Sequence, residues 1–277
     1  MLITRFAPSP TGPLHLGHAY SAMLAHDRAR AAGGTFHLRI DDLDQTRARP
    51  EWEAQIHDDL AWLGLDWPRP ALRQSARLPR YRTALTHLWD MGLLYPCTCT
   101  RSDIRAAVAA PQEGAALHGP DGVIYPGTCR PAAPPRGPMP ADNALRLDMA
   151  RAIKRLDSPL AYLEKDHTVT PQDMVDTVGD VVLSRRDLGA SYHLAVVLDD
   201  ADQEITHVIR GEDLSGATPI HVLLQRLLGL ASPAYHHHRL IRDETGKRLA
   251  KRDDARAIAT YRAAGATPGD IRVMVGL

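Results

Sequence analysis

The first eighteen residues, MLITRFAPSPTGPLHLGH, constrain the fold of this chain more than any other stretch. The apolar run at 2–7 predicts a strand, and three prolines stiffen the loop that follows it. The HLGH segment at 15–18 then opens an amphipathic stretch that ends at the Gly33-Gly34 pair, which is typical of a helix stop. TFHLRI at 35–40 predicts the next strand. This order predicts a right-handed βαβ unit with parallel strands.

The two histidines of this unit, His15 and His18, point to anion chemistry. They lie where a parallel sheet meets a helix N-terminus, whose N–H groups and dipole attract anions. A spacing of three residues places both rings on one helix face, where both can donate to one phosphate. Gly17 between them lets a flat base approach the backbone. Taken alone, an H-x-G-H segment is explained equally well as a helix cap.

Composition narrows the class of protein. The 277 residues, 44% of them hydrophobic, suffice for a sizeable core and predict roughly two domains. The formal net charge is zero, so no overall field indicates nucleic acid. No stretch approaches the ~20 apolar residues that span a membrane, and the N-terminus does not resemble a signal peptide. The three cysteines, an odd number, argue against a disulfide scaffold, so we expect a cytoplasmic enzyme and a monomer.

The hydrophobic pattern predicts an α/β fold, a parallel sheet with helices on both faces. The expected helices lie at 50–63, 78–90 and 218–229, the expected strands at 93–100, 180–183, 205–213 and 234–241, and a buried segment of uncertain type at 192–200. The Pro-, Gly- and Ala-rich stretch at 101–140 reads as the start of an insertion that extends to about Val178.

Two motifs together indicate a family. RFAPSPTGPLHLGH resembles the HIGH-motif segment of class I aminoacyl-tRNA synthetases, in particular the glutamate branch. RLAKR at 248–252 resembles the KMSKS loop of the same family, with Arg248 and Ala250 replacing the first lysine and the serine. The resemblance implies a Rossmann-like fold that binds ATP with Mg²⁺, with His15, His18 and Lys251 as catalytic residues. The implied ATP contacts are His15, Gly17, His18, Arg248, Leu249 and Lys251.

The same resemblance implies a pocket for glutamate. Its implied members are Arg5, Ala7, Ser9, Asp41, Tyr192 and Arg210. The chemistry is consistent, because Arg5 and Arg210 can neutralise the side-chain carboxylate and Asp41 can face the ammonium group. Asp41 also heads the acidic cluster at 41–44, for which loop solvation and capping is the alternative explanation.

Three cysteines predict a structural zinc site. Cys97-x-Cys99 followed by Cys129 suits a tetrahedral zinc that lacks one ligand. General chemistry favours His118 as the fourth ligand, whereas the resemblance favours Tyr125, because some short family members bind zinc through three Cys and a Tyr. Three reduced structural cysteines are the alternative. For the histidine run at 236–238 we expect an ATP contact rather than a metal.

The expected function follows from the truncated branch of the family, which lacks the large helical domain that reads the anticodon. Members of that branch activate L-glutamate with ATP to glutamyl-adenylate without tRNA, then transfer glutamate to the queuosine base in the tRNA(Asp) anticodon. The expected domains are two catalytic halves at 1–96 and 179–254, a zinc-containing insertion at 97–178, and a short helical segment at 255–277 with no anticodon-binding domain. The alternatives are ordinary charging of tRNA by a glutamyl-tRNA synthetase, a nucleotidylyltransferase, and a catalytically silent glutamate- or RNA-binding module.

Overall fold

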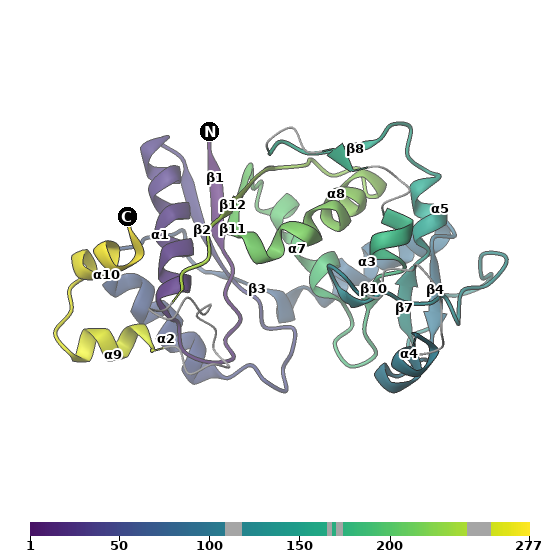
Figure 1. Ribbon diagram of the computed structural model, residues 1–277, viewed down its shortest axis with the longest axis horizontal. Coiled ribbons are helices and arrows are strands. Elements are labelled where there is room, and N and C mark those ends of the chain that lie inside the picture. The colour runs from purple at the N-terminus through teal and green to yellow at the C-terminus, as the bar shows by residue number, and fades with distance from the viewer. Residues whose placement is uncertain (109–117, 165–167, 170–173, 243–255) are drawn as a thin grey trace. The chain divides into compact units, whose positions relative to one another are not determined.

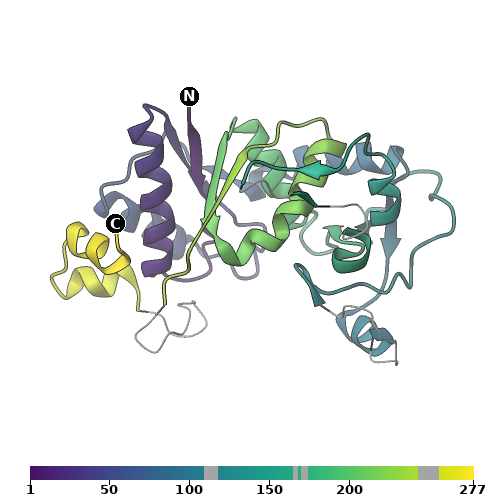
Figure 2. The same cartoon turned by 45° about the horizontal axis from the view of Figure 1, so that its top comes forward.

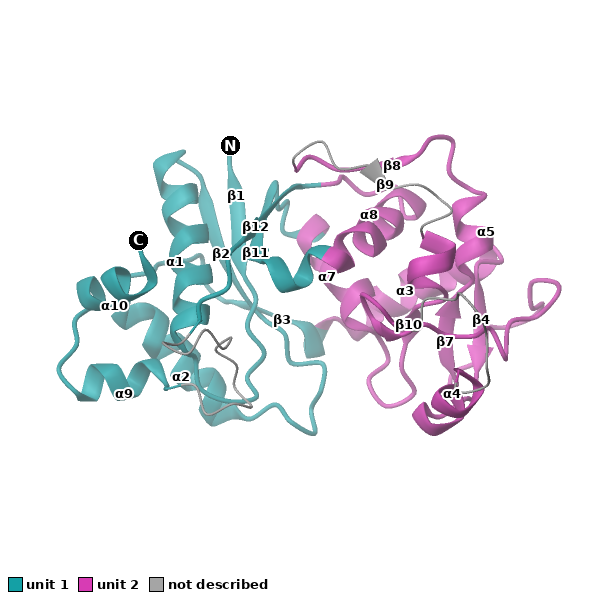
Figure 3. Ribbon diagram, viewed as in Figure 1, with its two compact units in different colours: residues 1–76, 202–215, 233–277 teal, residues 77–201, 216–232 magenta. Residues whose placement is uncertain are grey.

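The computed structural model describes residues 1–108, 118–164, 168–169, 174–242 and 256–277 (Figure 1). The chain divides into two compact units, each built from segments far apart in the sequence (Figure 3). Unit 1 comprises Met1–Ala76, Asp202–Ser215 and Pro233–Leu277, and unit 2 comprises Arg77–Ala201 and Gly216–Ser232. The domain boundaries expected from the sequence are a different division of the chain and stay predictions.

Unit 1 contains the predicted βαβ unit. Strands β1 (Ile3–Phe6), β2 (Thr35–Ile40) and β3 (Leu72–Arg73) form a parallel sheet in the order β1-β2-β3. Helix α1 (Leu16–Ala31) connects β1 to β2 and ends just before Gly33, which adopts the left-handed φ of 59°. The parallel βαβ arrangement and its glycine stop are therefore confirmed.

A second pair of parallel strands extends this arrangement. Strands β11 (His207–Gly211) and β12 (Ala234–His238) pair in parallel, and β11 lies beside β1 (Figure 1). Thr206 makes the junction, since its N–H donates to the Ile3 carbonyl at 3.0 Å and its hydroxyl accepts the Ile3 N–H at 2.8 Å. The strand order thus reverses between β1 and β11, which is where parallel sheets bind ligands at their carboxyl ends.

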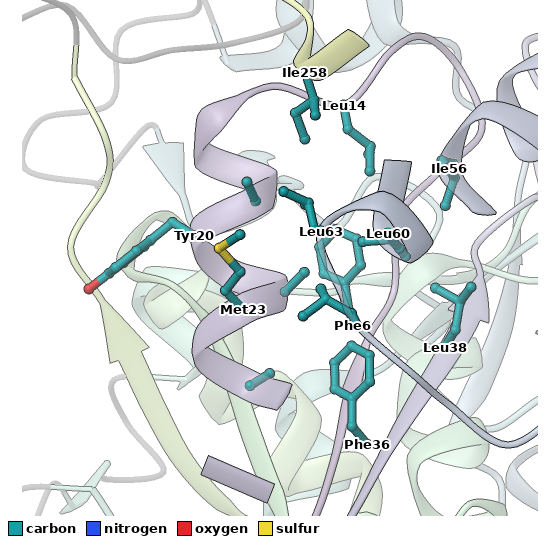
Figure 4. Close-up of a cluster of buried hydrophobic side chains, with 14 of the residues drawn as sticks. Phe6, Leu14, Tyr20, Met23, Phe36, Leu38, Ile56, Leu60, Leu63 and Ile258 are labelled. Atoms are coloured by element: carbon teal, nitrogen blue, oxygen red, sulfur yellow. The ribbon is translucent and has the colours of Figure 1, made fainter. Parts of the chain in front are cut away.

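One apolar core holds unit 1 together (Figure 4). Helix α2 (Pro50–Trp62) contributes Ile56 and Leu60, and the C-terminal helices α9 (Ile258–Ala263) and α10 (Pro268–Val275) contribute further buried side chains. Leu14 and Ile258 are both fully buried, and the Ile258 N–H donates to the Leu14 carbonyl at 2.9 Å. The segment at 256–277 therefore anchors the loop that leads into HLGH, as Figure 4 shows for these two side chains.

Unit 2 contains an antiparallel sheet. Strands β4 (Leu94–Cys97), β7 (Ala144–Leu147) and β10 (Val182–Ser184) pair in the order β10-β7-β4. The segments at 93–100 and 180–183 do contain strands, but the expectation that they belong to the parallel sheet is wrong. A short apolar run indicates a buried strand and says nothing of its partner, so the sequence left this pairing undetermined.

Three helices complete the framework of unit 2, α3 (Leu78–Asp90), α7 (Tyr192–Asp202) and α8 (Thr218–Leu227). The segment of uncertain type is α7, which is buried from His193 to Asp200. A helix without a polar face shows no 3.6-residue period, which explains the ambiguity. No helix in the described part of the chain is long and apolar enough to cross a membrane.

Shorter elements fill the connections. They are α4 (Arg101–Val108), β5 (His118–Gly119), β6 (Gly122–Val123), α5 (Met149–Ile153), β8 (Leu160–Ala161), β9 (Thr168–Val169) and the helical turns Gln74–Arg77, Met174–Val178 and Glu212–Ala217. Figure 2 shows the same elements after a turn of the molecule.

One buried charge in unit 1 opposes folding. Asp59 on α2 is 1% exposed, and neither of its carboxylate oxygens has a hydrogen-bond partner among the described residues. Burial, together with the nearby charge of Asp58, raises the pKa of Asp59 to about 6 against the opposing effect of Arg262.

The raised pKa of Asp59 makes a prediction about stability. The carboxyl group of Asp59 binds its proton more tightly in the folded state than in the unfolded chain. The stabilisation that this proton gives the folded state is fully present below about pH 4 and is lost as the pH rises through 6. The loss amounts to about 3 kcal/mol at 1.36 kcal/mol per pKa unit. We expect Asp59→Asn to raise the melting temperature at neutral pH and to flatten the pH dependence between about pH 4 and 6.5.

The matched control is Asp58→Asn, which removes the neighbouring exposed carboxylate. Its ion pair with Arg262 is exposed and contributes little, and burial is the larger cause of the raised pKa of Asp59, so this variant should keep most of the pH dependence of the wild type and reduce it only by the part that the Asp58 charge adds. Equal pH profiles for Asp59→Asn and the wild type would contradict the assignment.

Candidate functional site

The two histidines of HLGH cap helix α1 reciprocally. His15 is the N-cap residue, and its Nδ1 accepts the Gly17 N–H at 3.1 Å. Nδ1 of His18 accepts the His15 N–H, also at 3.1 Å. The ring centroids lie 3.8 Å apart, so the two imidazoles form one surface at the helix N-terminus. The sequence left open whether these histidines cap the helix or bind an anion. They do cap the helix, and the capping hydrogen bonds also orient both rings.

This cap fixes where each ring carries its proton. A neutral imidazole that accepts at Nδ1 carries its proton on Nε2, so His15 and His18 both present an Nε2–H donor. The positive end of the helix dipole lies at the same place. Gly17 leaves room for the His15 ring, because a Cβ at this position would lie 3.1 Å from Cε1 of His15 and the ring would have to shift by a few tenths of an ångström. The arrangement is suited to binding a phosphate.

The two arginines predicted to bind the carboxylate lie on adjacent strands of unit 1. Arg5 on β1 is 5% exposed, and Arg210 on β11 is 4% exposed. Nε of Arg210 donates to Nε2 of His237 at 3.2 Å, and its Nη2 donates to the Leu214 carbonyl at 3.2 Å. The guanidinium also lies 5.3 Å from the ring centroid of Tyr235. Arg210 is therefore oriented before any substrate binds.

Asp41 and Asp42, in the acidic cluster after β2, have different hydrogen-bond partners. Asp41, the predicted ammonium partner, accepts from Nε of Arg39 at 2.8 Å, and its N–H donates to the Pro8 carbonyl at 3.0 Å. Asp42 instead accepts from the N–H and the hydroxyl of Ser75, at 2.8 and 2.6 Å. Only Asp41 is thus attached to the loop after β1, while Asp42 fastens β2 to the segment after β3.

The other predicted contacts are distributed as follows. Ala7 and Ser9 lie in the loop after β1 in unit 1, and Tyr192 is the first residue of α7 in unit 2, where it is 37% exposed. The KMSKS-like residues Arg248, Leu249, Ala250 and Lys251 lie outside the described residues.

The three cysteines converge in unit 2. The Sγ atoms of Cys97, Cys99 and Cys129 all lie within 4.8 Å of one another, and those of Cys99 and Cys129 are 3.4 Å apart. Thiolates at a Zn–S distance of about 2.3 Å in a tetrahedron lie about 3.8 Å apart. The cluster therefore fits one zinc ion, whereas the alternative of three independent structural thiols does not explain why they meet.

Tyr125 is the residue that completes this cluster. Its hydroxyl lies 3.5 Å from the Sγ of both Cys97 and Cys99 and accepts the Cys129 N–H at 2.7 Å. His118 is not part of the group, since the only His/Cys/Asp/Glu cluster with metal-ligand geometry among the described residues is the three cysteines. Of the two fourth ligands left open by the sequence, the geometry supports Tyr125.

The pKa shifts in the cluster differ from residue to residue: burial raises the pKa of the Tyr125 hydroxyl and the pKa of Cys99 is also raised, whereas that of Cys129 is lowered. Burial raises the pKa of the Cys129 thiol, but hydrogen bonds from the Tyr125 hydroxyl and the Thr98 amide outweigh it and lower the pKa to about 6. Thiolate is the form that binds metal. Arg146 lies over the Tyr125 ring at 3.8 Å, and its Nε donates to Sγ of Cys97 at 3.3 Å. Its positive charge would offset the net charge of −1 that three thiolates leave on Zn²⁺.

The histidine run on β12 diverges. His236 pairs with Nη2 of Arg28 at 3.1 Å, and His237 accepts from Arg210. His238 hydrogen-bonds the Arg239 carbonyl at 2.9 Å through Nδ1. Alternate residues of a strand face opposite ways, so these rings do not gather around one ion. The expected contact of this run with ATP stays a prediction.

Three residues that support the site were not predicted from the sequence: Arg39, Arg146 and His237. The His237 contact had a signal, because β11 and β12 were both predicted strands and Arg210 directly faces His237 in their register. Arg39 and Arg146 are single arginines in a chain with 33 basic residues, and nothing in the local pattern distinguishes them.

Comparisons with known proteins agree with this geometry. The family described as tRNA synthetases class I (E and Q), catalytic domain, matches residues 1–276. The chain belongs to this family. The expected fold class, a class I synthetase fold with a parallel Rossmann-like sheet, is therefore confirmed.

The chain is most informatively compared with two curated relatives of one name. It is 61% identical to the Glutamyl-Q tRNA(Asp) synthetase of Rhodobacter capsulatus over 279 residues, covering 100% of both chains. It is 43% identical to the Glutamyl-Q tRNA(Asp) synthetase of Symbiobacterium thermophilum, covering 97% of this chain and 83% of that one.

Solved structures extend the comparison. A glutamate tRNA ligase from Elizabethkingia meningosepticum, crystallised with its amino acid, is 30% identical with a TM-score of 0.69 over 91% of this chain. The chain spans about half of that ligase, 52% of its length. Methionyl-tRNA synthetase of Mycobacterium tuberculosis, bound by methionyl-adenylate, has a TM-score of 0.62 at 10% identity and shares the fold alone.

Proposed function

We propose that this protein activates L-glutamate with ATP and transfers it to the queuosine base in the anticodon of tRNA(Asp). The observation that carries the proposal is the 61% identity, over the full length of both chains, to a Glutamyl-Q tRNA(Asp) synthetase. The reciprocal histidine cap and the buried arginines supply groups that the first step needs. Because its substrate is a tRNA, we expect the reaction to occur in the cytoplasm.

In the first step, the α-carboxylate of glutamate attacks the α-phosphate of ATP and pyrophosphate leaves. The Nε2–H groups of His15 and His18 donate to the phosphate oxygens, on which negative charge increases in the crowded transition state. Because the backbone already holds both rings, they need no reorganisation when the reaction begins. Lys251 in the KMSKS-like loop stabilises the departing pyrophosphate, and Mg²⁺ accompanies ATP.

Glutamate is held by charge in this proposal. Arg210, fixed by His237 and Leu214, binds the side-chain carboxylate together with Arg5 on the adjacent strand. Asp41 faces the ammonium group, and its own orientation is set by Arg39. Ala7 and Ser9 contribute from the loop after β1, and Tyr192 contacts the same substrate. A cyclopentenediol hydroxyl of queuosine then attacks the acyl carbon of the glutamyl-adenylate, which forms an ester, breaks the bond to the phosphate oxygen and releases AMP and a proton.

Two assays test the function separately. We expect glutamate to support ATP–pyrophosphate exchange without any RNA, because all groups named for activation belong to this chain. We then expect transfer of labelled glutamate to tRNA(Asp) that carries queuosine and none to unmodified tRNA(Asp).

Each alternative function predicts a different pattern in these assays. Charging of tRNA(Glu) and of neither tRNA(Asp) preparation would favour ordinary glutamyl-tRNA synthesis. Exchange that does not depend on glutamate would favour a nucleotidylyltransferase, and no activity in either assay would favour a glutamate- or RNA-binding module.

Specificity for glutamate over glutamine follows from the two buried arginines. Glutamine has the same shape but no charge, so it cannot compensate the positive charge of the two buried guanidinium groups, and removing the partner of a buried charge costs about 3–5 kcal/mol. At 1.36 kcal/mol per tenfold, this predicts that glutamate is preferred over glutamine in exchange by roughly 10² to 10³ or better. We expect Arg5→Ala to impair glutamate activation more than glutamine activation. The ratio of the exchange rate with glutamate to that with glutamine should therefore decrease.

The comparison needs both amino acids on the wild type and on the variant. If Arg5→Ala lowers both rates by the same factor, Arg5 acts on a group common to the two substrates, such as the α-carboxylate or a phosphate. The assignment of Arg5 to the side-chain carboxylate would then be wrong.

We also propose that Cys97, Cys99, Cys129 and Tyr125 hold one structural zinc ion. The support is the approach of the three sulfurs and the phenol oxygen described above, with Arg146 beside them. When bound, zinc would fasten the end of β4 to the loop that carries Cys129, and it would take no part in catalysis.

We expect elemental analysis of the purified protein to give one zinc per chain, because the cysteines already lie at ligand spacing. Tyr125→Phe should speed the loss of zinc to a chelator, whereas His118→Ala should not. Purified protein without zinc, or faster loss in the His118 variant alone, would contradict the proposed ligand set.

A further inference from the structure

A short hairpin in unit 2, formed by β5 and β6, packs closely against neighbouring backbone. Strands β5 and β6 leave Pro120 and Asp121 at the hairpin tip. A Cβ at Gly119 would lie 2.3 Å from the Thr177 carbonyl oxygen, and a Cβ at Gly216 would lie 3.2 Å from Cβ of Pro120. The hairpin therefore contacts backbone on one side and the residues before α8 on the other. These contacts fix the position of its tip.

The hairpin tip begins a chain of polar groups. Oδ1 of Asp121 lies 3.2 Å from Nε2 of His193, near the start of α7, and Nδ1 of His193 lies 3.1 Å from Nε2 of His221 on α8. The imidazoles are 6% and 2% exposed, whereas the Asp121 side chain is 48% exposed. A continuous carboxylate–imidazole–imidazole chain thus runs from the surface into the contact between α7 and α8.

The chemistry of these groups fixes the orientation of both rings. A carboxylate oxygen cannot donate, so Oδ1 of Asp121, 3.2 Å from Nε2 of His193, favours the tautomer that carries a proton on that nitrogen. One further proton then lies between Nδ1 of His193 and Nε2 of His221. Rotation of the His193 ring would break both contacts in a place that water reaches poorly.

Tyr192 rests on the two oriented imidazoles. Its ring centroid lies 5.5 Å from that of His193 and 5.6 Å from that of His221, with interplanar angles of 63° and 64°. The two histidine rings are themselves 5.3 Å apart. Edge-to-face contacts of this kind depend on ring orientation. The orientation of the two imidazoles therefore determines how the partly exposed tyrosine is held.

We propose that Asp121, His193 and His221 position Tyr192 for the glutamate substrate, so that the β5–β6 hairpin sets the affinity for the amino acid. This inference rests on the proposed function, in which Tyr192 contacts glutamate. The two imidazoles are buried and act through Tyr192, which makes all three positioning residues rather than catalytic ones.

The test compares two substitutions at the hairpin tip. Asp121→Asn keeps an oxygen that accepts from His193, whereas Asp121→Ala removes the acceptor. In glutamate-dependent ATP–pyrophosphate exchange, Asp121→Ala should raise the KM for glutamate about tenfold, as expected for the loss of a polar contact that orients a buried imidazole. The KM for ATP and the kcat should stay within about twofold. Asp121→Asn should remain close to the wild type.

A double-mutant cycle separates positioning from a general loss of structure. In a Tyr192→Ala background, adding Asp121→Ala should cause no further rise in the KM for glutamate, because the residue through which the chain acts is absent. Asp142→Ala is the matched control, since this exposed aspartate of unit 2 has no ion pair or hydrogen bond among the described residues. It should change neither KM.

Three results would overturn the inference. They are an equal rise in the KM values for glutamate and ATP in Asp121→Ala, an additive effect in the Tyr192→Ala background, and a loss in Asp121→Asn as large as in Asp121→Ala. Wild-type protein that shows no glutamate-dependent exchange would instead overturn the proposed function, and the inference with it.

Discussion

The reciprocal cap at the N-terminus of α1 is the constraint on which the activation chemistry of this protein depends. Two imidazoles satisfy backbone N–H groups that an ordinary cap would leave to a serine or an aspartate. That local requirement leaves the proton of each neutral ring on Nε2, beside the positive end of the helix dipole. In the proposed function, the same hydrogen bonds that begin the helix therefore also orient the two rings for a phosphate.

The cap is effective because the surrounding backbone holds it in place. The loop before it contributes Leu14 to the main core and bonds to Ile258, so the C-terminal helices help to fix the start of α1. Asp41 attaches the end of β2 to the same loop through Pro8. The carboxyl ends of β1 and β2 are thereby joined at the place where the strand order of unit 1 reverses.

Histidine performs three distinct structural tasks in this chain. It caps a helix at His15 and His18, accepts from a buried arginine at His237, and links a surface carboxylate to a buried helix contact at His193. In each case one ring nitrogen contacts a fixed partner, and this contact determines whether the other nitrogen can donate or accept a hydrogen bond. In the cysteine cluster, the buried Arg146 donates to Sγ of Cys97, and its positive charge compensates the negative charge of thiolates in a buried place.

The sequence by itself determined the local elements and the two motifs. The strand–loop–helix order at the N-terminus, the proline and glycine boundaries and the HLGH spacing depend on nearest neighbours along the chain, so their physics is readable without coordinates. Only the tertiary structure decided which strands pair, as the antiparallel placement of β4 and β10 shows. It also placed Tyr125, and not His118, beside the three cysteines, and it brought Asp121, His193 and His221 together across about a hundred residues of sequence. Pairing and long-range contacts depend on how apolar faces pack, and a linear pattern of residues does not encode which faces meet.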